Sequence, residues 1–130
     1  MRLTLAVLVA SMAPLAFAAE SVSAIGTWTV TQVETDPTMP ITAVVEGDPA
    51  YLGAELVITR SAMTWNTAAT NGQGTFDDCP SPRFSRGGDG TIAVSCGGAH
   101  WGPEASLTPI SANALRLGWY DGGVLILTRD

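Results

Sequence analysis

The chain has 130 residues, with 12 acidic residues against 6 basic ones and a formal net charge of −6 at pH 7. This acidic balance argues against nucleic acid and against anionic lipid surfaces as partners, because both attract basic proteins. The length fits one domain with a hydrophobic core of its own.

The first 18 residues have the pattern of a secretory signal peptide. Arg2 precedes an apolar run that ends in Ala16-Phe17-Ala18, which matches the charged start, apolar middle and small-residue cleavage site of such leaders. The run is shorter than the roughly 20 apolar residues of a membrane-spanning helix, and Pro14 interrupts it. We therefore expect cleavage after Ala18 or one residue later, and a single periplasmic or secreted domain over residues 19–130 without a membrane segment.

The chain has two cysteines, Cys79 and Cys96, and one histidine, His100. In an exported protein two cysteines favour a disulfide, which would contribute about 3 kcal/mol by closing a loop of this length. A metal site is not expected, because one histidine and two separated cysteines do not make a ligand set. No motif for a cofactor is present either.

Alternation of apolar and polar residues predicts about eight β-strands, and helical periodicity is missing after the leader. The strands are expected over residues 23–33, 52–59, 62–67, 75–79, 91–96, 105–110, 115–120 and 124–129. In the second of these, Leu52, Ala54, Leu56 and Ile58 share one face. Strands at this near-regular spacing are typical of an all-β sandwich or barrel, and we expect a small antiparallel up-and-down barrel.

Residues 34–50 form a long predicted loop with three prolines, and Asp48 followed by Pro49 favours one helical turn within it. Loops of this length in compact domains are usually binding loops or mobile segments. A second loop, over residues 97–103, contains His100 and Trp101.

The final hairpin organises the predicted fold. Asp121-Gly122-Gly123 is a turn signal between two alternating runs. A three-residue turn there would pair Trp119 with Leu125 and Leu117 with Leu127. It would also place one apolar set on a single face, and a hairpin needs further strands to cover such a face. That set is Leu115, Leu117, Trp119, Leu125 and Leu127.

Gly26-Thr27-Trp28 at the start of the first strand and Leu125-x-Leu127-Thr128-Arg129 at the end of the last resemble lipocalins and their calycin relatives. The resemblance implies that the first and last strands meet to close a barrel, with Trp28 at its closed end and Arg129 packed across the ring. Such a cation–π contact contributes about 0.5–2 kcal/mol. The chain is also similar in architecture to small exported inhibitors of bacterial metalloproteases, which combine a signal peptide, Gly-x-Trp, an eight-stranded barrel and one disulfide.

The candidate site residues divide between the barrel mouth and its rim. Leu56, Met63 and Trp65 would line an apolar cavity of about 300 Å³ or more if the barrel holds a ligand. His100 and Trp101 lie together in a loop, but no nucleophile motif accompanies the histidine, so no catalytic residue is assigned.

Two other groups of polar residues have competing interpretations. Arg83 and Arg86 flank Phe84 and could hold an anionic ligand; the alternative is pairing with Asp77 and Asp78. Adjacent strand residues point to opposite faces, so these two carboxylates are not expected to converge on a site and are interpreted as solvated.

The sequence therefore favours a small exported, monomeric binding protein that is not an enzyme. Its partner would be an apolar small molecule in the barrel mouth or a macromolecule on the rim. The alternative is an inhibitor of a periplasmic or secreted hydrolase such as a metalloprotease, with residues 19–25 or 34–50 as the inserted segment.

Overall fold

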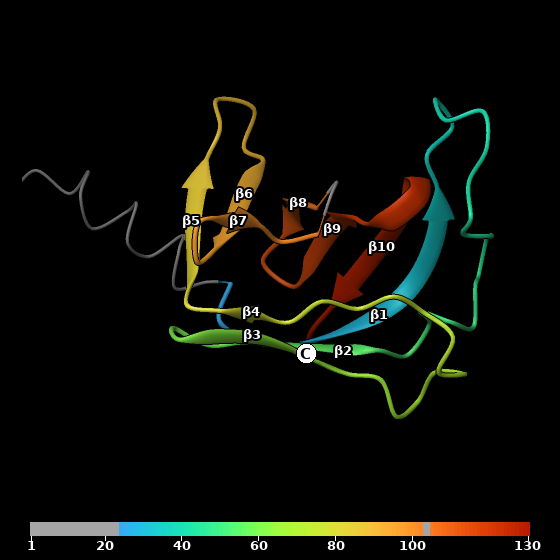
Figure 1. Cartoon of the computed structure of the whole chain (residues 1–130), viewed down its shortest axis with the longest axis horizontal. Helices are drawn as coiled ribbons and strands as arrows, with labels where there is room; N and C mark the ends of the chain where they lie inside the picture. Colours follow the sequence, from blue (N-terminus) through green and yellow to red (C-terminus); the bar gives the residue numbers. More distant parts are fainter. Residues whose placement is uncertain (1–23, 103–104) are drawn as a thin grey trace, which may run out of the picture.

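The computed structural model describes residues 24–102 and 105–130, so the predicted leader, its cleavage site and most of residues 19–25 lie outside the described residues. The described chain is almost entirely strands and loops (Figure 1). The elements are β1 (Gly26–Thr35), β2 (Glu55–Ile58), β3 (Ala62–Asn66), β4 (Cys79–Pro80), β5 (Pro82–Arg86), β6 (Ile92–Cys96), β7 (Ala99–His100), β8 (Ser106–Ser111), β9 (Ala114–Gly118), η1 (Tyr120–Gly122) and β10 (Gly123–Thr128).

The strands form one antiparallel sheet that curls into a nearly closed barrel, which confirms the predicted fold class. The order is β4-β3-β2-β1-β10-β9-β8-β6-β5, with β7 paired to β6. Most strands that follow one another in the chain therefore lie side by side, and β1 meets β10, as the resemblance implies. The two end strands, β4 and β5, are separated only by Ser81.

The predicted disulfide is present at this seam. Cys79 on β4 is bonded to Cys96 on β6. Because β4 pairs with β3 and β5 pairs with β6, the bond joins the two ends of the sheet where the hydrogen-bonded ladder is interrupted. The disulfide thus supplies a covalent closure where backbone pairing alone leaves a gap.

The barrel end near the start of β1 is closed by Trp28. Its ring is 1% exposed, and its indole nitrogen donates a hydrogen bond to the Ala24 carbonyl at 2.9 Å. The Arg129 guanidinium carbon lies 4.2 Å from the ring centroid, and the same guanidinium donates to the Ile25 carbonyl at 2.9 Å. A Cβ at Gly26 would lie 3.3 Å from the Arg129 side chain, so the glycine lets the arginine pack over the entry to β1.

The final hairpin has the predicted inward face but a different register. Leu125 pairs with Leu117 and Leu127 with Leu115, so the prediction was wrong by two residues. The turn is longer than three residues, because η1 follows Trp119 and the Trp119 N–H donates to the Gly123 carbonyl at 2.8 Å. A shift of two residues preserves side-chain alternation, and all five predicted inward residues are buried.

Other differences occur at the ends of elements. Leu52 lies before β2 and is 40% exposed, so its predicted inward orientation was wrong. Of the strand expected over residues 75–79, only Cys79 belongs to the ladder, where it begins β4. Part of the loop expected over residues 97–103 is β7. No helix in the described chain is long and apolar enough to cross a membrane.

Candidate functional site

The residues predicted to line a ligand cavity pack in the hydrophobic core of the barrel. Leu56 and Met63 are fully buried, and Trp65 packs against the same core from a partly buried position. Six rings are in contact at this mouth of the barrel, with centroid separations of 4.8–6.1 Å. They are Tyr51, Trp65, Phe76, Trp101, Trp119 and Tyr120. We call this set the aromatic cluster.

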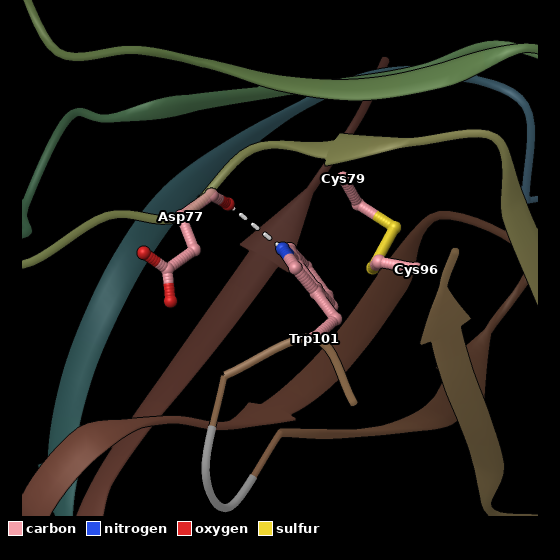
Figure 2. Close-up of a disulfide and its surroundings, with 4 residues drawn as sticks. All are labelled: Asp77, Cys79, Cys96 and Trp101. Atoms are coloured by element: carbon pink, nitrogen blue, oxygen red, sulfur yellow. Dashed lines mark hydrogen bonds between the residues drawn. A yellow bond between two sulfur atoms is a disulfide. The ribbon is translucent and has the colours of Figure 1, made fainter. Parts of the chain in front are cut away.

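A segment outside the ladder, residues 75–78, is held across the aromatic cluster by side chains. The Trp119 and Trp101 indole nitrogens donate to the carbonyls of Thr75 and Asp77 at 2.7 and 2.8 Å. Figure 2 shows the second of these bonds beside the disulfide. The indole nitrogens of Trp101 and Trp119 therefore both have their hydrogen-bond acceptors in this segment, which accounts for the position of Trp101 inside the barrel.

Asp77 and Asp78 both have protein partners, so the interpretation of these residues as simply solvated was incomplete. The Tyr120 hydroxyl donates to the Asp77 carboxylate. The backbone N–H of Trp65 donates to the Asp78 carboxylate at 2.9 Å. Their roles are to hold residues 75–78 against the cluster. The Trp65 indole nitrogen is the one buried side-chain polar atom that lacks a hydrogen bond in the described chain, which costs on the order of 1–3 kcal/mol.

Two predicted site residues, Arg83 and His100, do not belong to the aromatic cluster. Arg83 is exposed on β5, and His100 is exposed on β7, where its backbone pairs with Ser95. Trp101, the next residue, is 1% exposed. The sequence neighbours His100 and Trp101 thus point to different environments. Over the described ranges, no three His, Cys, Asp or Glu side chains come together as metal ligands would.

Replacing His100 by alanine should change the free energy of unfolding by less than about 0.5 kcal/mol, because the residue is exposed. Urea denaturation followed by tryptophan fluorescence measures this difference. Trp101→Ala is the matched control: it empties a buried ring site and should cost about 3–5 kcal/mol. A loss above about 1 kcal/mol for His100→Ala would show that the imidazole supports the fold.

The pockets that we describe lie on the outside of the barrel or at its ends. One of about 340 Å³ at the closed end is lined by Trp28, Arg86 and Asp89 among others. Another of about 330 Å³ is bounded by Asp36, Met39 and Arg116, and a shallow trough of about 630 Å³ follows the outer face of β1. None of these three, all within the described residues, is lined by Leu56, Met63 or Trp65.

The loop between β1 and β2 is the main feature outside the barrel. We call residues 36–52 the docking loop. It passes beyond the tip of β1 and returns along the outer side of that strand (Figure 1). The Asp36 N–H donates to the Gly122 carbonyl at 2.8 Å, and the Gly47 N–H donates to the Val33 carbonyl at 2.9 Å. These bonds anchor the docking loop to the β9–β10 turn and to β1.

Side-chain packing anchors the same loop. Val44 is 2% exposed, and a Cβ on Gly123 would lie 2.9 Å from its Cγ2 atom. A Cβ on Gly122 would lie 2.8 Å from the Thr42 Cγ2 atom. The two turn glycines are therefore required where the docking loop rests on the hairpin, in addition to any role in the turn itself.

Carboxylates complete the internal bonding of the docking loop. Asp48 accepts hydrogen bonds from the N–H groups of Ala50 and Val45 at 3.0 and 3.3 Å, so the predicted capping role is present in a turn but no helix is assigned. Asp36 accepts from the Thr38 hydroxyl and N–H. These two bonds, with a smaller contribution from the Arg116 charge, lower the pKa of Asp36.

The docking loop also carries most of the exposed large hydrophobic side chains. Five such residues occur in the described chain, and four of them are in this loop. Ile41 is 84% exposed and Val45 is 59% exposed; Met39 and Leu52 are the other two. Scattered exposed apolar residues need no explanation, but four of them on one ordered segment make this loop the candidate site for contact with another molecule.

Sequence reasoning identified this loop as a candidate binding segment from its length and prolines, but it did not identify Ile41 or Val45. An irregular loop lacks the alternation that separates inward from outward residues in strands. Within residues 41–45 the structure buries Val44, whereas Ile41, Ala43 and Val45 are exposed. No known family model, curated protein or solved structure matches the chain.

Proposed function

We propose that this protein is an exported, non-enzymatic binding protein that engages a macromolecule through the docking loop. The observation that carries the proposal is the grouping of exposed apolar side chains on an anchored loop. The filled barrel supports a partner on the outside over an apolar molecule within, because Leu56 and Met63 leave no exposed surface at the predicted cavity. Export is supported by the leader pattern and by the disulfide.

Kinship with lipocalins is part of the same proposal. The Arg129 contact on Trp28 and the β1–β10 pairing support it. In this chain the barrel would act as a scaffold, since its side chains occupy the interior and function is left to a loop that the scaffold positions.

A second candidate function is inhibition of a periplasmic or secreted hydrolase, in which the docking loop enters the active-site cleft. Three prolines restrict this loop, and anchors on both sides of Ile41 hold its base. A restrained segment loses little conformational entropy on insertion, which favours tight binding. Inhibition of a secreted metalloprotease by the purified protein, lost on Ile41→Asp, would select this candidate.

Site-specific photocrosslinking tests the proposed function. A photoreactive amino acid at position 41 should give a discrete adduct with a macromolecule from the exporting cells. The same label at Ile110, which is 57% exposed on β8, is the matched control and should give none. Equal labelling from both positions would contradict the proposal, as would native mass spectrometry that finds a small ligand retained by wild type and lost on Trp65→Ala.

A further inference from the structure

The docking loop lies among negative charges. Residues 34–55 contain five carboxylates and no lysine, arginine or histidine. Glu34 and Glu46 are exposed, and Glu46 is held at the base of the loop by hydrogen bonds from Thr35. Asp121 is exposed in the β9–β10 turn, directly beside the Gly122 carbonyl that accepts from the loop. We call Glu34, Asp36, Glu46, Asp48 and Asp121 the acidic collar.

Three carboxylates of the collar, those of Asp36, Glu46 and Asp48, are held in place by hydrogen bonds. Hydrogen bonds to Asp36 lower its pKa, and Asp48 and Glu46 accept bonds from neighbouring donors. Arg116 borders the pocket at the loop base and offsets one of these charges. Exposed apolar side chains and carboxylates therefore lie on the same loop, in a chain that is itself strongly acidic.

We infer that the partner of the docking loop is a protein with an apolar cleft edged by lysine and arginine. This inference rests on the proposed function. The apolar side chains of Met39, Ile41 and Val45 would enter the cleft, and the acidic collar would face the basic edge. Complementary charge at such a rim accelerates association and excludes wrong partners.

Charge also argues against another copy of this chain as the occupant. Two copies joined through their docking loops would place one acidic collar against another, and like charges juxtaposed at an interface are unfavourable. A basic partner removes this repulsion. Salt screens the attraction between exposed charges beyond about 8–10 Å at physiological ionic strength. Binding to a basic partner should therefore weaken as ionic strength rises.

The experiment uses a phage-displayed library of disulfide-cyclised random peptides as the probe. The library is selected on the exported protein and counter-selected on the Ile41→Asp, Val45→Asp double variant. Enriched peptides should combine aliphatic or aromatic residues with lysine or arginine. Synthetic copies of them are then measured by surface plasmon resonance at low and physiological salt.

Charge-neutral variants test the collar. The double variant Glu34→Gln, Asp121→Asn should bind the enriched peptides with about 10-fold lower affinity, or about 3-fold for each charge removed. Most of this loss should come from slower association. Asp130→Asn is the matched control, because it removes one exposed charge near Gly26, at the other end of β1, and should change affinity less than about 1.5-fold.

Each outcome has a distinct meaning. Cationic peptides that lose affinity with the collar variants and with salt support the inference. Peptides that require Ile41 and Val45 but are neutral or acidic overturn it and leave the proposed function standing. A selection that yields no peptide dependent on these two residues overturns the inference and the proposed function together.

Discussion

Replacing Trp28 by alanine is expected to lower the free energy of unfolding by about 3–5 kcal/mol. The ring is 1% exposed, so the variant would leave a cavity at the closed end of the barrel. It would also remove the surface on which the Arg129 guanidinium lies at 4.2 Å from the centroid. Urea denaturation followed by circular dichroism measures the change.

The variant Arg129→Ala distinguishes the contribution of the buried Trp28 ring to stability from that of the Arg129 side chain. That variant keeps the buried ring but loses the cation–π contact, worth about 0.5–2 kcal/mol, and the hydrogen bonds to the carbonyls of Ile25 and Ala112. The free energy of unfolding should fall clearly less in Arg129→Ala than in Trp28→Ala. A loss below about 1 kcal/mol for Trp28→Ala would contradict a core role for the ring and remove the main structural support for kinship with lipocalins.

The second large effect is expected from the disulfide. Replacing Cys79 and Cys96 together by alanine should lower the free energy of unfolding by about 3 kcal/mol, because the unfolded chain regains the entropy of an open loop. The bond spans 17 positions in the sequence and joins β4 to β6 at the gap in the ladder. Urea denaturation with and without a thiol reductant measures the change.

Two controls accompany the double variant. Wild type in reductant should match the variant, and the variant should not respond to reductant. Near-ultraviolet circular dichroism adds a local readout: Cys79 directly follows the segment that binds the indoles of Trp101 and Trp119, so loss of the bond should weaken the tryptophan signal. A variant as stable as wild type would mean that strand pairing alone holds the seam.

These two predictions concern the scaffold, whereas the photocrosslinking and peptide-selection experiments concern the docking loop. The two sets test different contacts, because the loop anchors at Val33, Gly122 and Gly123 involve neither Trp28 nor the disulfide. A variant such as Ile41→Asp should leave stability nearly unchanged, since its side chain is 84% exposed, and so can test binding without unfolding the barrel.

The sequence by itself determined the strand-rich fold, the faces of most strands and the disulfide, and the resemblance of its two ends to lipocalins implied the closure of β1 on β10. Alternation has a period of two, so inward residues such as Leu56, Leu117 and Leu125 can be recognised from their immediate neighbours alone. The same locality explains why the hairpin face was correct although its register was wrong by two residues: a shift of two preserves every face.

Only the tertiary structure decided the register, the filling of the interior and the exposed surface. Asp121 adopts a positive φ of 53° inside η1, and the longer turn that results is set where Thr42 and Val44 of a distant loop rest on the two glycines. Whether a small barrel is open or filled depends on how side chains from all strands meet, as the aromatic cluster does here. Exposure in the docking loop likewise depends on which apolar residues find room against the hairpin, because an irregular segment has no local period to reveal it.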